Sequence, residues 1–319
     1  MVHALIRVAA AVVTVIATAA AGEGLLRLKN ADQMSYQVEM WRYAKVLKQP
    51  VADERLGHIH RPSRSARLQN VTISLNSVGL RGPEPDLGNG DKARVLLLGS
   101  SITLGWGVSE EDTLRAKLEA MLEGRAQVWN AGVGNYNAER YVTLFERYLQ
   151  DLRPDVVVVH YFVNDAEILA PPRDNLLLRH SQLALMLWQA VLNFRQGKRD
   201  LSGLVERYRE VYAEGSEARS RMERALTRLR DLARKSGTRV LLAMMPDIHN
   251  LVDYPFGFVH EHMARLARQL GWEYVDLLEA LHIDDPRSIY AIPGDPHPNA
   301  MGHRLMAEAI APVVERMLD

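Results

Sequence analysis

The chain has 319 residues, 39 Lys and Arg against 39 Asp and Glu, 47% hydrophobic residues and no cysteine. This length suffices for one large α/β domain or two small ones, with an ample core. The balanced charge, without a long basic block, argues against a nucleic-acid binder, whose affinity would depend on neutralised phosphates. Without cysteine there is no disulfide, thiolate metal site or thiol nucleophile, so covalent chemistry must use oxygen or nitrogen.

The N-terminal segment, residues 1–29, is predicted to be a signal anchor or a signal peptide. An uncharged apolar stretch runs from Val8 to Gly22, and its fifteen residues are fewer than the roughly 20 that span a bilayer core. Small residues at Ala19–Ala21 allow signal-peptide cleavage, whereas Leu25–Leu26 prolong the apolar face and favour an uncleaved anchor. Both alternatives place the main domain outside the cytoplasm, either membrane-anchored or secreted or periplasmic.

Residues 30–92 are polar and contain several prolines, which predicts an irregular lead-in without a core of its own. Only Val71–Leu75 alternates like a short strand. We expect the main domain to begin at residue 93 and to extend to residue 319.

From residue 93 onward, apolar runs alternate with helical patterns. The predicted strands contain Val95–Leu98, Val128–Trp129, Asp155–Tyr161, Val240–Met245 and Tyr274–Asp276. The predicted helices contain Leu114–Leu122, Val205–Lys235, His260–Leu270 and Met301–Leu318. Continuous apolar strands are typical of parallel sheets covered on both faces. The sequence therefore predicts an α/β fold with a doubly wound, mainly parallel five-stranded sheet flanked by helices, preceded by an N-terminal hydrophobic helix.

A helical insert at about residues 173–204 interrupts this alternation. It carries large apolar side chains at Leu183, Leu185, Leu187, Trp188, Val191, Leu192 and Phe194. Apolar helical stripes usually belong to the core, so we expect the insert to pack onto the domain. A lid or a membrane-facing surface are the alternatives.

Polar residues gather after three predicted strands and before the last helix. They are Ser100–Ser101, Asn130–Asn137, Asn164–Asp165 and Asp295–His297. Ligands of open parallel sheets bind outside the carboxyl ends of the strands, so we expect these groups to meet. A hydroxyl, an imidazole, a carboxylate and amide donors are the groups required for acyl transfer through a serine.

Each of these groups also has a structural explanation. Ser100 and Ser101 can cap the helix that follows, Asn164 can be a turn residue, and His297 can be a structural histidine. Singly, none of these observations decides for catalysis; their joint occurrence at one sheet edge favours it.

A metal or nucleotide site is less well supported. The pairs His58-x-His60, His260-x-His262 and Asp247-x-His249 lack the helical His-x-x-x-His spacing of zinc hydrolases. The loop Gly99–Gly107 has neither the dinucleotide fingerprint nor the lysine of a P-loop. We expect no metal and no cofactor.

The order and wording of the four blocks resemble the SGNH/GDSL hydrolase family, from about residue 76 to the C-terminus. Asn76–Gly82 is also similar to the sequence that precedes the first block in membrane-associated bacterial members. The resemblance implies a catalytic triad with Ser101 as nucleophile, His297 as base and Asp295 as acid. It implies an oxyanion hole made by the N–H groups of Ser101 and Asn135 and the side-chain amide of Asn164.

The sequence departs from the family pattern in four places. Ser100 replaces an aspartate, and Asn135 and Phe162 each stand where a glycine is usual. Asp295 precedes His297 by two residues, where three is usual; in an extended segment, residues two apart face the same side. Asp295 is therefore the least secure member of the predicted triad.

The resemblance implies a serine esterase that hydrolyses O-acyl esters, above all acetyl esters, of a carbohydrate or a small alcohol through an acyl-enzyme. Two alternatives stay open. The first is an O-acyltransferase that modifies an envelope polysaccharide or exopolysaccharide with the same triad. The second is a catalytically silent carbohydrate-binding or assembly protein, motivated by the departures above. The expected partners are an ester substrate and, through the N-terminal segment, a membrane; nucleic acid is not expected.

Overall fold

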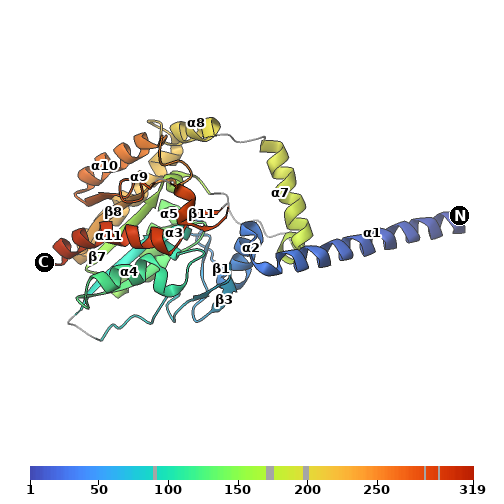
Figure 1. The fold of residues 1–319 in the computed structure, drawn as a ribbon, viewed down its shortest axis with the longest axis horizontal. Coiled ribbons are helices and arrows are strands. Elements are labelled where there is room, and N and C mark those ends of the chain that lie inside the picture. The colour runs from blue at the N-terminus through green and yellow to red at the C-terminus, as the bar shows by residue number, and fades with distance from the viewer. Residues whose placement is uncertain (89–91, 170–175, 197–200, 284, 294) are drawn as a thin grey trace.

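The computed structural model describes residues 1–88, 92–169, 176–196, 201–283, 285–293 and 295–319 (Figure 1). Its helices are α1 Val2–Lys29, α2 Tyr36–Leu47, α3 Ser101–Leu104, α4 Leu114–Met121, α5 Ala138–Leu144, α6 Leu176–His180, α7 Gln182–Gln196, α8 Leu201–Val211, α9 Glu217–Ser236, α10 Gly257–Leu270 and α11 Ala300–Leu318. Its strands are β1 Lys48–Pro50, β2 His58–His60, β3 Ser65–Leu68, β4 Val71–Ser74, β5 Ala93–Gly99, β6 Ala126–Gly132, β7 Val156–Phe162, β8 Arg239–Met245, β9 Glu273–Asp276, β10 Tyr290–Ile292 and β11 Asp295–Pro298.

The main sheet has five parallel strands in the order β6-β5-β7-β8-β9, which confirms the predicted fold class. The four valines Val156–Val159 of β7 are completely buried, as expected for a strand covered on both faces. The order reverses around β5, and such a reversal is where doubly wound sheets open a crevice. Gly99 at the end of β5 pairs with Gly132 of β6 and with His160 of β7. β5 and β6 therefore end at the same level, and β7 continues for two residues beyond it.

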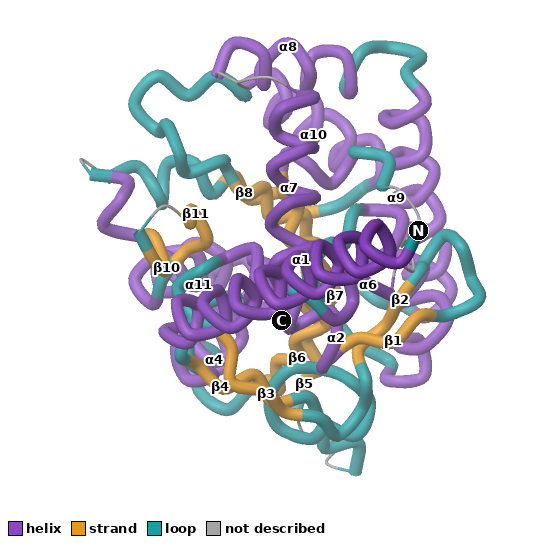
Figure 2. The backbone as a smooth tube through the Cα atoms, turned by 90° about the vertical axis from the view of Figure 1, so that its right-hand side faces the viewer, coloured by secondary structure: helices purple, strands orange, loops and turns teal. Residues whose placement is uncertain are grey.

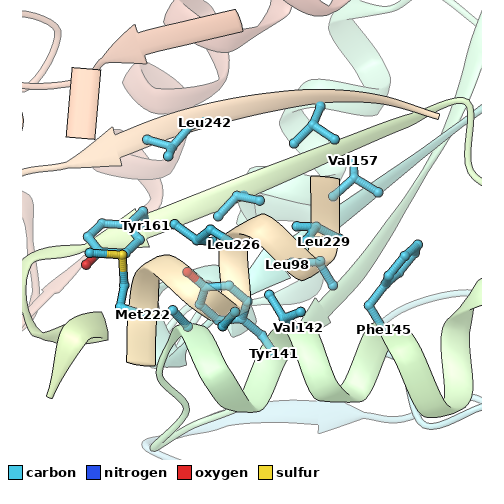
Figure 3. Close-up of a cluster of buried hydrophobic side chains, with 14 of the residues drawn as sticks. Leu98, Tyr141, Val142, Phe145, Val157, Tyr161, Met222, Leu226, Leu229 and Leu242 are labelled. Carbon is cyan, nitrogen blue, oxygen red and sulfur yellow. The ribbon is translucent and has the colours of Figure 1, made fainter. Parts of the chain in front are cut away.

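Helices cover both faces of this sheet. The side chains of α5, α9 and α10 form one core with the strands, and those of α4 and α11 form the other. Figure 3 shows the first core, where α5 and α9 pack on the strands through Leu98, Tyr141, Val142, Phe145, Val157, Tyr161, Met222, Leu226, Leu229 and Leu242. The two cores keep the sheet rigid beneath the loops that follow its strands.

The lead-in differs from the irregular segment that we expected. It contains α2 and two antiparallel hairpins, β1–β2 and β3–β4, which Figure 2 shows beside the main sheet. Buried apolar side chains of the lead-in form a small cluster with the loop after α3: Tyr43, Leu47, Leu68, Ile73, Leu75, Leu104 and Trp106. The strand predicted near Val71 is present as β4. Proline and glycine hide these short elements in the sequence, because hairpins of three or four residues leave little periodicity.

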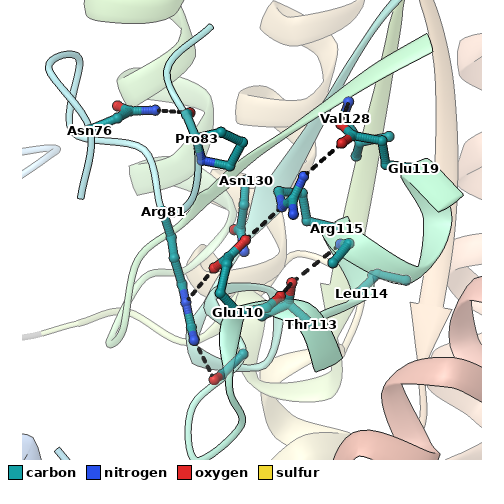
Figure 4. A network of polar contacts seen from close by, with 12 residues as sticks. Asn76, Arg81, Pro83, Glu110, Thr113, Leu114, Arg115, Glu119, Val128 and Asn130 are labelled. Atoms are coloured by element: carbon teal, nitrogen blue, oxygen red, sulfur yellow. Dashed lines mark hydrogen bonds and ion pairs between the residues drawn. The ribbon is translucent and has the colours of Figure 1, made fainter. Parts of the chain in front are cut away.

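Arg81 ties the lead-in to the loop after α3 (Figure 4). Its side chain is completely buried, and its Nε donates to Glu110 Oε2 at 3.0 Å. Its other nitrogens donate to the carbonyl oxygens of Leu104, Gly105 and Val108 at 2.6–2.9 Å. Arg81 thereby satisfies carbonyls that no helix or strand would use.

Replacing Arg81 by methionine should lower the free energy of unfolding by about 2–4 kcal/mol, because it breaks the ion pair with Glu110 and removes a charged donor from the carbonyls of Leu104, Gly105 and Val108. Denaturant titration measures the loss. Arg304→Met removes the exposed pair with Glu308 and should cost less than about 1 kcal/mol. Equal losses in the two variants would contradict the role given to Arg81.

The helix predicted over residues 205–235 is wrong as a single helix, because it is broken into α8 and α9. Gly215 takes a left-handed φ of 78°, and the Ser216 side chain accepts from the N–H of Arg219 to begin α9. These residues form a stop and start signal that the amphipathic pattern masked. The end of α9 is as expected, with Gly237 in the left-handed conformation.

The expectation that the insert packs onto the core is also wrong. The start of its helix α7 contacts α1, and the rest of α7 extends away from α1 and from the sheet (Figure 1). Glu23 of α1 accepts from the N–H groups of Gln182 and Leu183 at the start of α7. Large side chains of α7 remain exposed, among them Leu187 and Phe194. The expected start of the insert, residue 173, lies outside the described residues.

The N-terminal helix α1 extends from the domain without burying any residue. Within the described part of the chain, one helix, at residues 2–32, is long and apolar enough to cross a membrane. Such a helix is compatible with an anchor or with a signal sequence. Its basic residues Arg27 and Lys29 lie in the last turn, where positive charge is favourable for the helix dipole.

Candidate active site

Ser101 lies at the sharp turn between β5 and α3. Its Oγ is 2.8 Å from Nε2 of His297. Ser100 occupies the N-cap position of α3, but no side-chain capping bond forms there. A Cβ at Gly99 would lie 2.0 Å from Thr103 Oγ1, so only glycine allows α3 to turn back so closely on the strand. The Ser101 hydroxyl is thus directed to an imidazole rather than to helix capping.

Asp295 and His297 lie on the same side of the short strand β11. Nδ1 of His297 is 2.5 Å from Oδ1 of Asp295, which also accepts from the backbone N–H of His297 at 3.2 Å. The extended backbone explains why a spacing of two residues brings the carboxylate to the imidazole. Ser101, His297 and Asp295 therefore form one continuous hydrogen-bonded chain.

The lead-in contributes a contact to this chain that the sequence did not reveal. Gln69 donates from Nε2 to Oδ2 of Asp295 at 3.0 Å, so both carboxylate oxygens are engaged. Burial alone raises the pKa of Asp295, but the hydrogen bond and charge of His297, with the hydrogen bond of Gln69, outweigh it. The net pKa lies below its ordinary value. Asp295 is thus held ionised beside the imidazole.

Asn135 and Asn164 lie in the loops that follow β6 and β7, the strands on either side of β5. Asn135 follows β6 with a left-handed φ of 64°, and Asn164 lies in the single 3-10 turn after β7. Both line the same cleft as Ser101 and His297, and the cleft has a volume of about 310 Å³. Among the described residues, the N–H of Asn135 donates to no protein acceptor. The predicted site residues are therefore gathered at one place.

Other side chains complete the walls of the cleft. Tyr36 of α2 stacks on the His297 ring, with centroids 5.6 Å apart. Phe162, which stands where the family usually has a glycine, is one of the lining residues. His249 also lines it, and its Nδ1 lies 2.5 Å from Asp247 Oδ1. The hydrogen bond to Asp247 raises the pKa of His249. The sequence signal for this pair, an Asp-x-His directly after β8, repeats the spacing of Asp295 and His297.

The other histidine pairs do not assemble a metal site. No cluster of three or more His, Asp or Glu side chains suited to a metal occurs in the described ranges. His58 and His60 are buried under the loop after β6, and burial lowers the pKa of both. His260 hydrogen-bonds to Asp276 at the far edge of the sheet. These histidines have structural partners.

Residues 97–305 match the GDSL-like Lipase/Acylhydrolase family, and this span holds both the serine turn and the Asp-x-His strand. The chain belongs to this family. The resemblance to SGNH/GDSL hydrolases is thus confirmed, and a GDSL-like acylhydrolase is an ester-hydrolysing enzyme. No curated protein gives a significant match.

Solved structures of several hydrolases are similar to this GDSL-like chain at low identity. A catalytic mutant of an acetylxylan esterase from Geobacillus stearothermophilus shares 17% identity, covering 70% of this chain and 94% of that chain at a TM-score of 0.45. An α/β hydrolase from the metagenome of Lake Arreo, Spain, shares 17% identity, covering 73% of this chain and 99% of that chain at a TM-score of 0.47. A GDSL-like lipase from Bacteroides thetaiotaomicron shares 14% identity, covering 73% of this chain and 92% of that chain at a TM-score of 0.43.

Replacing Gln69 by leucine should reduce kcat by about tenfold, the equivalent of about 1.4 kcal/mol for a lost hydrogen bond to a charged group. The variant leaves Oδ2 of the buried Asp295 without its donor. Steady-state kinetics on a small acyl ester measures the effect. Gln150→Leu, at an exposed position, is the matched control. An unchanged kcat in Gln69→Leu would show that Asp295 does not need this contact.

Proposed function

We propose that the chain is a serine esterase that hydrolyses O-acyl esters, above all acetyl esters, of a carbohydrate or small alcohol. The observation that carries the proposal is the hydrogen-bonded chain from Ser101 through His297 to Asp295. The same cleft is lined by Asn135 and Asn164, and neither the Asn135 N–H nor the Asn164 side-chain amide has a protein partner among the described residues. The shortened spacing that motivated the catalytically silent alternative does not separate Asp295 from His297.

In the proposed mechanism, Nε2 of His297 removes the Ser101 proton while Oγ attacks the ester carbonyl carbon. The tetrahedral intermediate collapses, and the imidazolium protonates the departing alcohol oxygen. A water molecule, deprotonated by His297, then attacks the acyl-enzyme and releases the acid and the free Ser101. Asp295 stays ionised and stabilises the imidazolium in both halves of the reaction.

The negative charge of each tetrahedral intermediate requires donors near Ser101. We assign this role to the N–H groups of Ser101 and Asn135 and to the side-chain amide of Asn164. Loss of one such donor typically costs about 3–4 kcal/mol of transition-state stabilisation. Asn135 lines the cleft, and its N–H has no protein acceptor in the described part of the chain, which supports this assignment.

The walls of the cleft support a small acyl group on a polar alcohol. About 310 Å³ lies at the low end of ligand pockets, which begin near about 300 Å³. Phe162 narrows it, while Tyr36 and Tyr208 offer aromatic faces beside the polar Asp247 and His249. A sugar ester has both the apolar and the polar surface that such a lining accepts.

The cell location of the enzyme is part of the proposal. The apolar helix α1 supports an anchor or an export signal, of which we favour the uncleaved anchor because α7 packs against it. The catalytic domain is then outside the cytoplasm.

Replacement of Ser101 by alanine should reduce kcat by about 10⁴-fold or more, because the nucleophile is lost while the fold remains. A fluorophosphonate probe on the purified wild-type protein should label Ser101, as peptide mass spectrometry detects. Ser100→Ala, next to it in the chain, should still be labelled. A folded wild-type protein that is not labelled would favour the silent alternative.

Acyl transfer is the second candidate function, and His249 is the observation that favours it. Its Nε2 has no hydrogen-bond partner among the described residues, while Asp247 orients its ring, so it can accept a proton from a sugar hydroxyl. We expect His249→Ala to lower the yield of transferred product from an oligosaccharide acceptor about tenfold while acetate release to water stays within twofold. Release of acetate alone, with no transferred product in the wild type, would exclude the transferase.

A further inference from the structure

The lead-in holds the loop that carries Asn135 through hydrogen bonds to Gly134. Gly134 donates its N–H to the hydroxyl of Tyr43 at 2.9 Å and accepts at its carbonyl from Nζ of Lys48 at 2.6 Å. His58 Nε2 lies 3.4 Å from the same carbonyl oxygen. Tyr43 belongs to α2, and Lys48 and His58 belong to the hairpin β1–β2. Both polar groups of Gly134 are therefore fixed by residues from outside the sheet.

These hydrogen bonds require glycine at position 134. A Cβ there would lie 2.7 Å from Cε1 of Tyr43, a distance that packed atoms do not tolerate. The aromatic ring thus fills the space where a side chain would be, and the backbone itself meets the hydroxyl and the amine.

Because the peptide unit is planar, holding the Gly134 carbonyl also fixes the direction of the Asn135 N–H. The carbonyl of Gly134 and the N–H of Asn135 belong to one peptide unit, and no cis peptide occurs among the described residues. In a trans peptide these two groups point in opposite directions. Because Lys48 holds the carbonyl on the buried side, the N–H of Asn135 points the opposite way, and Asn135 is a lining residue of the cleft. The next carbonyl, that of Asn135, is held by Nη1 of Arg140 at 2.9 Å.

Lys48 is a costly residue at this place. It is buried, and burial together with the charge of Arg140 lowers its pKa to about 7. No carboxylate of the described residues pairs with it; its contacts are the Gly134 carbonyl and the face of the Tyr43 ring at 4.5 Å. Buried amines without a carboxylate destabilise a fold. A methionine of similar length would fill the same space without that penalty, and His58 Nε2 would remain 3.4 Å from the Gly134 carbonyl oxygen, so stability alone does not explain the lysine.

We propose that Lys48 is a positioning residue that orients the Gly134–Asn135 peptide so that the N–H of Asn135 meets the oxyanion. The inference rests on the esterase proposed above and names the device that holds its oxyanion hole in place. Lys48 acts through the peptide and does not touch the substrate. A donor on the carbonyl also polarises the peptide, and this strengthens the N–H as a donor in turn.

The test is Lys48→Met in the full chain, with Lys45→Met as the matched control. Lys45 is exposed on α2 and lies over the Trp41 ring. We expect kcat on p-nitrophenyl acetate to fall by about 10- to 100-fold in Lys48→Met, part of the effect of losing an oxyanion donor, with KM within about twofold. Affinity for phenylboronic acid, which forms a tetrahedral adduct on a serine, should fall by a similar factor. The melting temperature should not fall.

Opposite results overturn the proposal. A folded Lys48→Met protein with unchanged kcat and boronate affinity, or one that loses only thermal stability, assigns Lys48 a structural role. If Lys48→Met is not folded, Tyr43→Phe must show the kcat loss instead, because it removes the hydroxyl that accepts from the Gly134 N–H. Failure of the esterase itself is seen separately, because the wild type would then lack turnover that Ser101→Ala abolishes.

Discussion

Gly99 of β5 pairs with Gly132 of β6 on one side and with His160 of β7 on the other. The loops after these three strands therefore leave the sheet side by side, and each supplies a different group to the cleft. Rigid strands covered by helices on both faces hold these loops with little freedom. The imidazole reaches them from β11, a strand of only four residues that precedes the last helix. The chemistry of the site follows from this alignment.

The sequence was sufficient to predict the sheet and the residues at its edge. Parallel strands covered on both faces are unbroken apolar runs, so the valines of β7 and the leucines of β5 were visible without structure. The two-residue spacing of Asp295 and His297 also predicted that their side chains face the same side of an extended segment. The break at Gly215 was missed because the regular apolar pattern of α9 is a stronger helix signal than one glycine is a sign of a break. The placement of α7 was missed because an apolar helix does not say which surface covers it.

The lead-in shows where sequence patterns stop being informative. Gln69 meets Asp295 across 226 residues of chain, and Lys48 meets Gly134 across 86. Such contacts leave no periodicity, and the few apolar residues around Tyr43 and Trp106 are too scattered to predict a core. A segment that appeared to be only a connection hydrogen-bonds to both the Asp295 carboxylate and the Gly134 carbonyl. The lead-in is therefore joined to the residues that follow position 93 by buried polar contacts.

The six residues 30–35 join α1 to α2, and the first residue of α2, Tyr36, lies against the His297 ring. Six residues reach about 20 Å when fully stretched. With α1 in a bilayer, such a short tether would confine the His297 imidazole to a thin shell above the lipid headgroups. An ester carried farther from the membrane would then be beyond the reach of the cleft.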